Sequence, residues 1–117
     1  MKKDNLLFLN HILEAVSNIE DYVKDTSSLE DFIKDKKTHD AVLRSFQVIG
    51  EAANNLDEEF MKLESDIEWE KVIGMRNFII HEYFGVDLKI VWDTIKKDLP
   101  IFKENIKKLL QKITYSS

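Results

Sequence analysis

The spacing of apolar residues is the feature that most constrains the fold of this chain. They recur every three or four positions along most of the 117 residues, which places them on one side of an α-helix. No stretch shows the alternation of apolar and polar residues that a half-buried β-strand requires. Only 3 glycines and 1 proline are available to interrupt helices. The pattern therefore predicts an all-α fold.

The first part of the chain is expected to form one long helix and one short helix. One continuous apolar stripe comprises Leu6, Leu9, Ile12, Leu13, Val16, Ile19 and Val23. This stripe predicts a helix over Asn5–Lys24. Ser27 and Glu30 then have the spacing of a capping box, in which each side chain bonds the backbone N–H of the other residue. They predict a short helix over Leu29–Lys34 that buries Leu29, Phe32 and Ile33.

Thr38 is the expected cap of a third helix, on which Gly50 should allow another helix to approach closely. The apolar face of this helix comprises Val42, Phe46, Ile49, Ala53, Leu56 and Phe60. A second capping box, formed by Ser65 and Glu68, predicts a helix that begins near Trp69. Gly85 should end that helix, because glycine adopts the left-handed conformation without the steric cost of a Cβ.

The last part of the chain is predicted to be one helical stretch that Asp87 caps. Its apolar positions are Val91, Trp92, Ile95, Leu99, Phe102, Ile106, Leu109, Leu110 and Ile113. Pro100 lies within this stretch and should kink it or split it in two, because proline lacks the N–H that a helix interior uses. The whole pattern predicts a single domain over residues 1–117, an antiparallel bundle of about four long helices and one short helix.

Composition excludes several classes of function. The chain has no cysteine, so it can form neither a disulfide framework nor a thiolate metal site. It has no apolar run near the roughly 20 residues of a membrane span, and its polar N-terminus lacks a signal-peptide pattern. We therefore expect a soluble, cytoplasmic protein that does not associate with membranes. The net charge of −5 argues against general coating of nucleic acid, which needs many phosphate contacts.

The segment from Arg76 to Tyr83 contains the residues best suited to chemistry. Only Arg44 and Arg76 are arginines among the 17 basic residues, and arginine offers a fork of donors that matches phosphate oxygens. His81 can act as an acid or a base near neutral pH. The segment could therefore hold and cleave a phosphodiester. The alternative is a solvated arginine, a capping or core imidazole at His81, and a Tyr83 that is only an amphipathic edge residue.

A geometric difficulty follows from the spacing of these residues. Arg76 and His81 lie about 140° apart around an unbroken helix, because each residue turns the helix by about 100°. Either the helix ends or bends near His81, or a second chain completes the site. Glu51 is interpreted as an acid on the surface of its helix, with a pair to Arg44 or Arg76 as the alternative.

The other two histidines carry weaker expectations. His11 is expected at the surface, and His39 is expected to be solvated. No pair of histidines has the spacing of zinc ligands, and the chain has no phosphate-binding glycine loop. We therefore expect neither a metal nor a cofactor.

The pattern Arg76-x-x-x-x-His81-x-Tyr83 resembles the signature of the HEPN superfamily, and specifically of its HepT-like toxin branch. Asn77 follows the arginine, as it does in that branch. Arg44 and the run Ile49-Gly50-Glu51-Ala52 are similar to its upstream helix. Val91-Trp92 and Asp98-Leu99-Pro100 resemble its closing helix. The similarity covers nearly the whole chain.

The resemblance implies a homodimer in which two such segments face each other across a shared cleft. It implies a toxin endoribonuclease that cleaves RNA without a metal, with Arg76 and His81 as catalytic residues and Asn77 and Tyr83 in contact with substrate. It further implies a cognate nucleotidyltransferase antitoxin, which adds AMP to Tyr83 and silences the enzyme. In that reading His81 transfers protons with its dimer mate and Arg76 stabilises the phosphorane.

Two other classes of function remain open at this point. The first is a catalytically inactive HEPN helical subunit that binds substrate or nucleotide for a partner nucleotidyltransferase. The second is a helical dimerisation module. The intact set of Arg76, His81 and Tyr83 favours the enzyme, because a scaffold does not require these residues together.

Overall fold

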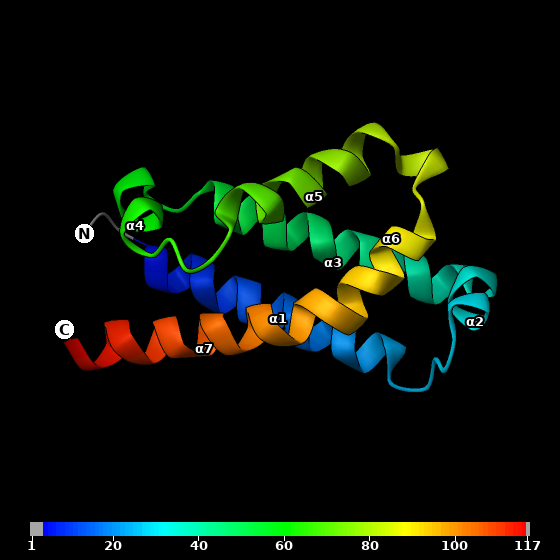
Figure 1. Ribbon diagram of the computed structural model, residues 1–117, viewed down its shortest axis with the longest axis horizontal. Coiled ribbons are helices and arrows are strands. Elements are labelled where there is room, and N and C mark those ends of the chain that lie inside the picture. The colour runs from blue at the N-terminus through cyan, green and yellow to red at the C-terminus, as the bar shows by residue number, and fades with distance from the viewer. Residues whose placement is uncertain (1–3, 117) are drawn as a thin grey trace.

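The computed structural model describes residues 4–116, and these residues form an all-α antiparallel bundle without a β-strand (Figure 1). The long helices are α1 (Asn5–Val23), α3 (Lys36–Asn54), α5 (Trp69–His81) and α7 (Leu99–Ser116). Between them lie the short helices α2 (Leu29–Lys34), α4 (Glu58–Leu63) and α6 (Leu88–Asp93). The predicted fold class is confirmed, with α4 and α6 as short helices that the prediction did not separate. No helix among residues 4–116 is long and apolar enough to cross a bilayer.

The order of the long helices places α3 at the centre of the site described below. α1 packs against α3 and α7, while α5 packs against the other side of α3. Each packed pair runs in opposite directions (Figure 1). The core follows the predicted stripes, and Leu9, Ile12, Val16 and Ile19 of α1 are fully buried. Burial of such side chains contributes about 1.5–3 kcal/mol each to folding. Leu6 departs from the stripe and is exposed.

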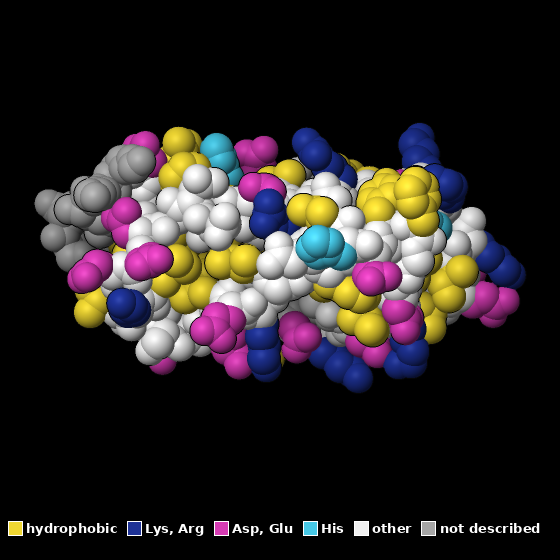
Figure 2. Space-filling view, turned by 90° about the horizontal axis from the view of Figure 1, so that it is seen from above, with side chains coloured by type: hydrophobic (Ala, Val, Ile, Leu, Met, Phe, Trp, Pro, Cys, Tyr) yellow, Lys and Arg dark blue, Asp and Glu magenta, His cyan; other side chains and the backbone are white. Residues whose placement is uncertain are grey.

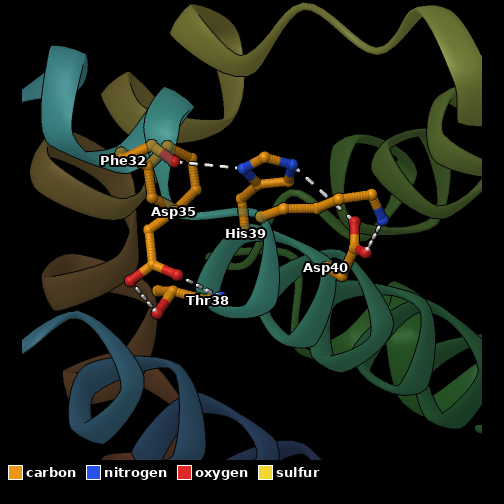
Figure 3. Close-up of polar contacts among 6 residues, drawn as sticks. Phe32, Asp35, Thr38, His39 and Asp40 are labelled. Atoms are coloured by element: carbon orange, nitrogen blue, oxygen red, sulfur yellow. Dashed lines mark hydrogen bonds and ion pairs between the residues drawn. The ribbon is translucent and has the colours of Figure 1, made fainter.

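The caps of α2 and α3 differ from the predicted residues, by one position for α2 and by three for α3. Ser28 caps α2, since its hydroxyl accepts a hydrogen bond from the Asp31 N–H. Asp35 caps α3, and Thr38 donates to it from both its backbone and its hydroxyl (Figure 3). The donors that the cap must satisfy lie two or three residues inside each helix, so the capping residue precedes the first turn.

Side-chain burial around α2 also differs from the prediction. Ile33 is exposed, whereas Phe32 is fully buried and packs against Trp92. His39 is not solvated. Its ring lies edge-on to Phe32, and its Nδ1 is 3.1 Å from the Phe32 carbonyl oxygen (Figure 3). Phe32 is the buried residue of this six-residue helix, and Leu29 is partly buried against the core.

The third helix ends earlier than its apolar pattern predicted. α3 stops at Asn54, and Leu56 and Phe60 are buried from the following turn and from α4. A tertiary contact anchors the start of α4, because the buried Asn5 of α1 accepts a hydrogen bond from the Asp57 N–H and donates one to the Asp57 carboxylate.

At both ends of α5, the interactions that start or stop the helix differ from those that the sequence predicted. Glu68 occupies the N-cap position without a side-chain hydrogen bond, so Ser65 and Glu68 do not form a capping box. At the other end the helix stops at His81, and residues Tyr83–Gly85 form a 3₁₀ turn, η1. Gly85 does not adopt the left-handed conformation. Its N–H instead closes the turn by bonding the Glu82 carbonyl at 2.7 Å.

The last helical stretch bends as Pro100 predicted. Asp87 caps α6 as expected, and its carboxylate accepts the Lys89 N–H. A π-helical turn over Thr94–Asp98 joins α6 to α7, with the Leu99 N–H bonded to the Thr94 carbonyl five residues earlier. The axis changes direction between α6 and α7 (Figure 1). A proline cannot donate to the preceding turn, and a wider π turn accommodates its missing hydrogen bond without ending the helix.

Candidate functional site

Gly50 brings the two helices of the candidate site into unusually close contact. A Cβ built on this buried glycine of α3 would lie 2.2 Å from the Cβ of Arg76 on α5. Any larger residue would push the helices apart, because real Cβ atoms do not approach so closely. The expectation that Gly50 permits close helix contact is confirmed. The close approach places the start of the Arg76 side chain directly on the surface of α3.

The guanidinium of Arg76 is held in a defined orientation. Its Nε donates to Glu51 Oε1 at 2.7 Å, and its Nη2 lies 2.7 Å from the same oxygen. Nη1 donates to the Asn77 side-chain oxygen at 3.0 Å. The Arg76 side chain is only 24% exposed. Arg76 is therefore not a freely solvated helix residue. The alternative for Glu51, a pair with Arg76, is confirmed, while the Glu51 side chain stays 52% exposed on the surface of α3.

In this arrangement Asn77 has a structural role that could not be predicted from its being an asparagine. Its amide oxygen accepts from Arg76, so the amide and Glu51 hold the guanidinium from two directions. A guanidinium has five N–H donors. The three contacts to Glu51 and Asn77 leave one N–H on each terminal nitrogen for an anionic ligand. Two parallel donors are the arrangement that binds a phosphate group.

His81 is the last residue of α5 and is exposed to solvent. The part of the chain that the structure describes gives it neither a hydrogen bond nor an ion pair, so it is not the capping or core imidazole of the alternative. Arg76 and His81 lie within one continuous helix, which ends at His81. The ending of the helix therefore does not remove their angular separation. Within residues 4–116 no hydrogen bond joins their side chains, and one chain presents them as separate half-sites.

Tyr83 lies in turn η1, two residues beyond the end of α5. Its ring is 44% exposed and packs edge-on against Phe84 with 5.5 Å between ring centroids. The hydrogen bond to Asp40 and the charge of Asp40 raise the pKa of Lys36 at the start of α3. The Tyr83 side chain remains partly accessible to solvent.

The surface at the end of α5 carries exposed apolar side chains beside the polar residues His81 and Tyr83. Ile80 is half-exposed and Phe84 is fully exposed. Figure 2 views the molecule from above, and hydrophobic side chains gather over the end of α5 and η1, on the right of the view. Large exposed hydrophobic residues that adjoin one another mark interaction surfaces. Among residues 4–116 no group of three histidine, aspartate or glutamate side chains is arranged to hold a metal ion.

Comparison with known proteins identifies the family. A family model described as "Ribonuclease HepT-like" matches residues 12–109, which include every residue of the candidate site. The chain belongs to this family. The HepT-like chain is 40% identical over 109 residues to "Probable ribonuclease HepT" of Thermococcus cleftensis, covering 93% of this chain and 98% of that protein.

Two other relatives agree with this assignment. The HepT-like chain is 43% identical over 113 residues to "Gamma-glutamylcyclotransferase and putative RNase" of Methanocaldococcus jannaschii, covering 97% of this chain and half of that longer protein. It is 43% identical over 105 residues to a protein of Caldanaerobacter subterraneus that is also named as an RNase, covering 90% of this chain and 93% of that protein. Family and names together support an RNase function. No solved structure matches the HepT-like chain at a significant level.

Proposed function

We propose that this HepT-like chain is a toxin endoribonuclease with an active site shared between two copies of the chain. The observation that carries the proposal is the restrained guanidinium of Arg76, about one and a half turns before an exposed histidine. Two of its N–H groups have no partner among the described residues. Such a cation stabilises charge on phosphate oxygens without reorganising during the reaction. The family assignment supports RNA as the substrate.

The proposed reaction uses the ribose 2′-hydroxyl of the RNA as its nucleophile. The 2′-oxygen attacks the adjacent phosphorus while a base removes its proton, and the bond from phosphorus to the 5′-oxygen breaks as an acid protonates that oxygen. The products are a 2′,3′-cyclic phosphate and a 5′-hydroxyl. His81 and its copy in the second chain serve as base and acid. Arg76 donates to the phosphorane, while Asn77 orients Arg76 and contacts the substrate. This set of groups requires no metal ion.

A homodimer supplies the geometry that one chain lacks. The half-sites at Arg76 and His81 lie on different sides of α5, so a second α5 is needed to place a histidine opposite an arginine. The apolar surface formed by Ile80, Tyr83 and Phe84 adjoins these residues and supports an interface at the end of α5. A two-fold axis near this surface would bring together two copies of the same patch, as in most homodimers.

Control of the enzyme is proposed to operate through Tyr83. The resemblance to the toxin branch implies a nucleotidyltransferase antitoxin that adds AMP to this phenol, and the exposure of Tyr83 in η1 is compatible with access by a second enzyme. Each added AMP brings a negative charge and a purine to the edge of the site. The modification would therefore exclude RNA by size and by charge.

The test is an RNA cleavage assay with purified protein. His81→Ala and Arg76→Ala should each lower the cleavage rate by about 10²–10⁴-fold without unfolding the protein. Cleavage by the wild type should persist in excess EDTA. Loss of activity in EDTA with recovery in magnesium would contradict the metal-free mechanism. A wild type that binds RNA yet never cleaves it would instead indicate an inactive subunit that serves a nucleotidyltransferase.

A further inference from the structure

A polar pocket lies between α1 and α3, beside the restrained arginine. It has a volume of about 320 Å³ and is open to solvent. Its lining comprises Phe8, His11, Arg44, Gln47, Val48, Glu51, Ala52 and Asn55. Glu51 is shared by the pocket and the candidate site, since it lines the pocket and its Oε1 also holds Arg76. A ligand in the pocket would therefore lie next to a ligand on Arg76.

The charge of this pocket favours an anion. Arg44 is exposed, and the described part of the chain gives it no hydrogen bond or ion pair. The carboxylate of Glu51 is already paired with Arg76, which offsets its repulsion of a phosphate. Arg44 is therefore the group in the pocket with an uncommitted charge. Its planar fork of donors suits a phosphate better than a lysine would.

The remaining walls provide the contacts that a nucleobase uses. Phe8 and His11 lie edge-to-face, with ring centroids 6.3 Å apart and an interplanar angle of 78°. A base can stack on an exposed ring, and this contact is worth about 1–3 kcal/mol whatever the base. The amide of Gln47 offers both donors and acceptors. That of Asn55 is fixed by its bond to the Glu51 carbonyl, with its oxygen still available to a ligand.

We propose that this pocket binds one unstacked nucleotide of the RNA substrate, adjacent to the phosphodiester held at Arg76. The base lies against His11 and Phe8 within reach of Gln47, and the phosphate of that nucleotide binds Arg44. The volume is at the lower end of the range for small-ligand sites, which fits a single nucleotide. The assignment rests on the proposed ribonuclease function, and it predicts that the enzyme requires single-stranded RNA at this position.

A binding experiment tests the pocket separately from cleavage. The full chain is titrated against a fluorescent single-stranded RNA with 2′-O-methyl riboses, which cannot be cleaved, at several salt concentrations. Arg44→Gln should weaken binding about ten-fold or more, as expected for a hydrogen bond to a charged group. It should also reduce the slope of log affinity against log salt by about 0.7, the contribution of one phosphate contact to a single strand. The matched control is Lys62→Gln, which removes an exposed positive charge on α4 outside the pocket and should change neither quantity.

A second variant tests the aromatic wall of the pocket, which Phe8 and His11 form. His11→Ala should weaken binding roughly five-fold or more through lost stacking while leaving the salt slope unchanged. A duplex of the same sequence should bind equally well to the wild type and to His11→Ala, because its bases are not available for stacking. Equal losses for single strand and duplex would assign the effect of His11 to something other than an unstacked base and overturn the proposal.

The outcomes separate this inference from the proposed function. If the wild type cleaves RNA while Arg44→Gln retains wild-type affinity and salt slope, the pocket is not a substrate site and the ribonuclease proposal stands. If 5′-AMP or 5′-UMP alone binds as tightly as the oligonucleotide and Arg44→Gln abolishes that binding, the pocket is a free-nucleotide site and the RNA assignment is overturned. If the wild type neither binds nor cleaves RNA, both proposals fail.

Discussion

Glu51 on α3 holds Arg76 on α5 through two 2.7 Å contacts to a single carboxylate oxygen. The residue before Glu51 is Gly50, whose missing side chain leaves room for Arg76 to cross. One short segment of α3 therefore sets both the position and the orientation of the guanidinium. The pair is partly exposed, with the Glu51 side chain 52% accessible, so its role in stability is small and its role in positioning is the larger one.

Glu51→Gln tests this positioning role. The neutral amide binds the guanidinium less strongly, so Arg76 should sample several orientations and the cleavage rate at saturating RNA should fall about ten- to a hundred-fold. Thermal unfolding should change little, since exposed ion pairs contribute at most about 1 kcal/mol. Glu51→Asp keeps the charge on a shorter side chain and should recover part of the rate. A Glu51→Gln enzyme with the wild-type rate would show that Arg76 needs no anchor.

Gly50→Ala and Gly74→Ala form a matched pair of substitutions. An alanine at position 50 meets the Arg76 side chain at 2.2 Å and should destabilise the fold by about 1–3 kcal/mol through overpacking. An alanine at position 74 on α5 meets nothing within 4 Å, and should stabilise the helix by about 0.5–1 kcal/mol. Urea unfolding measures both. If the two substitutions changed the free energy of unfolding equally, α3 and α5 would not pack through Gly50.

The apolar end of α5 predicts a homodimer. Sedimentation at micromolar concentration should give about twice the mass of one chain. Phe84→Ser should shift the protein towards the monomer and lower cleavage in parallel, because Phe84 is fully exposed and its loss leaves the core intact. Leu63→Ser removes another exposed apolar residue, on α4, and should leave the dimer unchanged. A wild type that sediments as a clean monomer would remove the shared-site argument.

Tyr83 is predicted to be the point of control. Incubation with the cognate nucleotidyltransferase and ATP should add one or more AMP units at Tyr83 and silence cleavage, as read by intact-mass and peptide spectra. Tyr83→Phe should still cleave RNA and escape silencing, because the hydroxyl is the acceptor and not a catalytic group. Silencing of the wild type by its partner without a change of mass would mean inhibition by contact alone.

The cap of α3 predicts a pH dependence of stability. The pKa of Asp35 is lowered from 3.8, chiefly by the hydrogen bonds from the Thr38 hydroxyl and backbone N–H. A lowered folded pKa gives stability that is present above the unfolded value and is lost as pH falls through the folded one. Asp35→Ala should therefore destabilise the protein at pH 7, and the difference from wild type should shrink below about pH 3.8. Asp25→Ala removes an exposed carboxylate outside any cap and serves as the control in urea titrations at both pH values.

Local pattern was enough to predict the helices, but not how each one begins and ends. The start of α1 was predicted correctly from apolar spacing, because burial of one helix face repeats every 3.6 residues whatever the neighbours are. The predicted bounds of α2 also agree with the structure, although they rested on a capping box. The cap of α2 was assigned to Ser27 when Ser28 holds that position. Adjacent serines have the same chemistry, and only the path of the backbone decides which hydroxyl reaches an N–H.

Sequence alone determined the all-α class, the bend at Pro100 and the candidate segment from Arg76 to Tyr83. Tertiary structure alone decided that Glu51 anchors Arg76, a contact between residues 25 positions apart. It also decided that the start of α4 is anchored to α1 where the Asp57 N–H meets Asn5, 52 positions away. The physical reason is that periodicity reports which face of a helix is buried, whereas a contact between helices depends on how closely their backbones cross. At the site that distance is set by the absence of one side chain at Gly50.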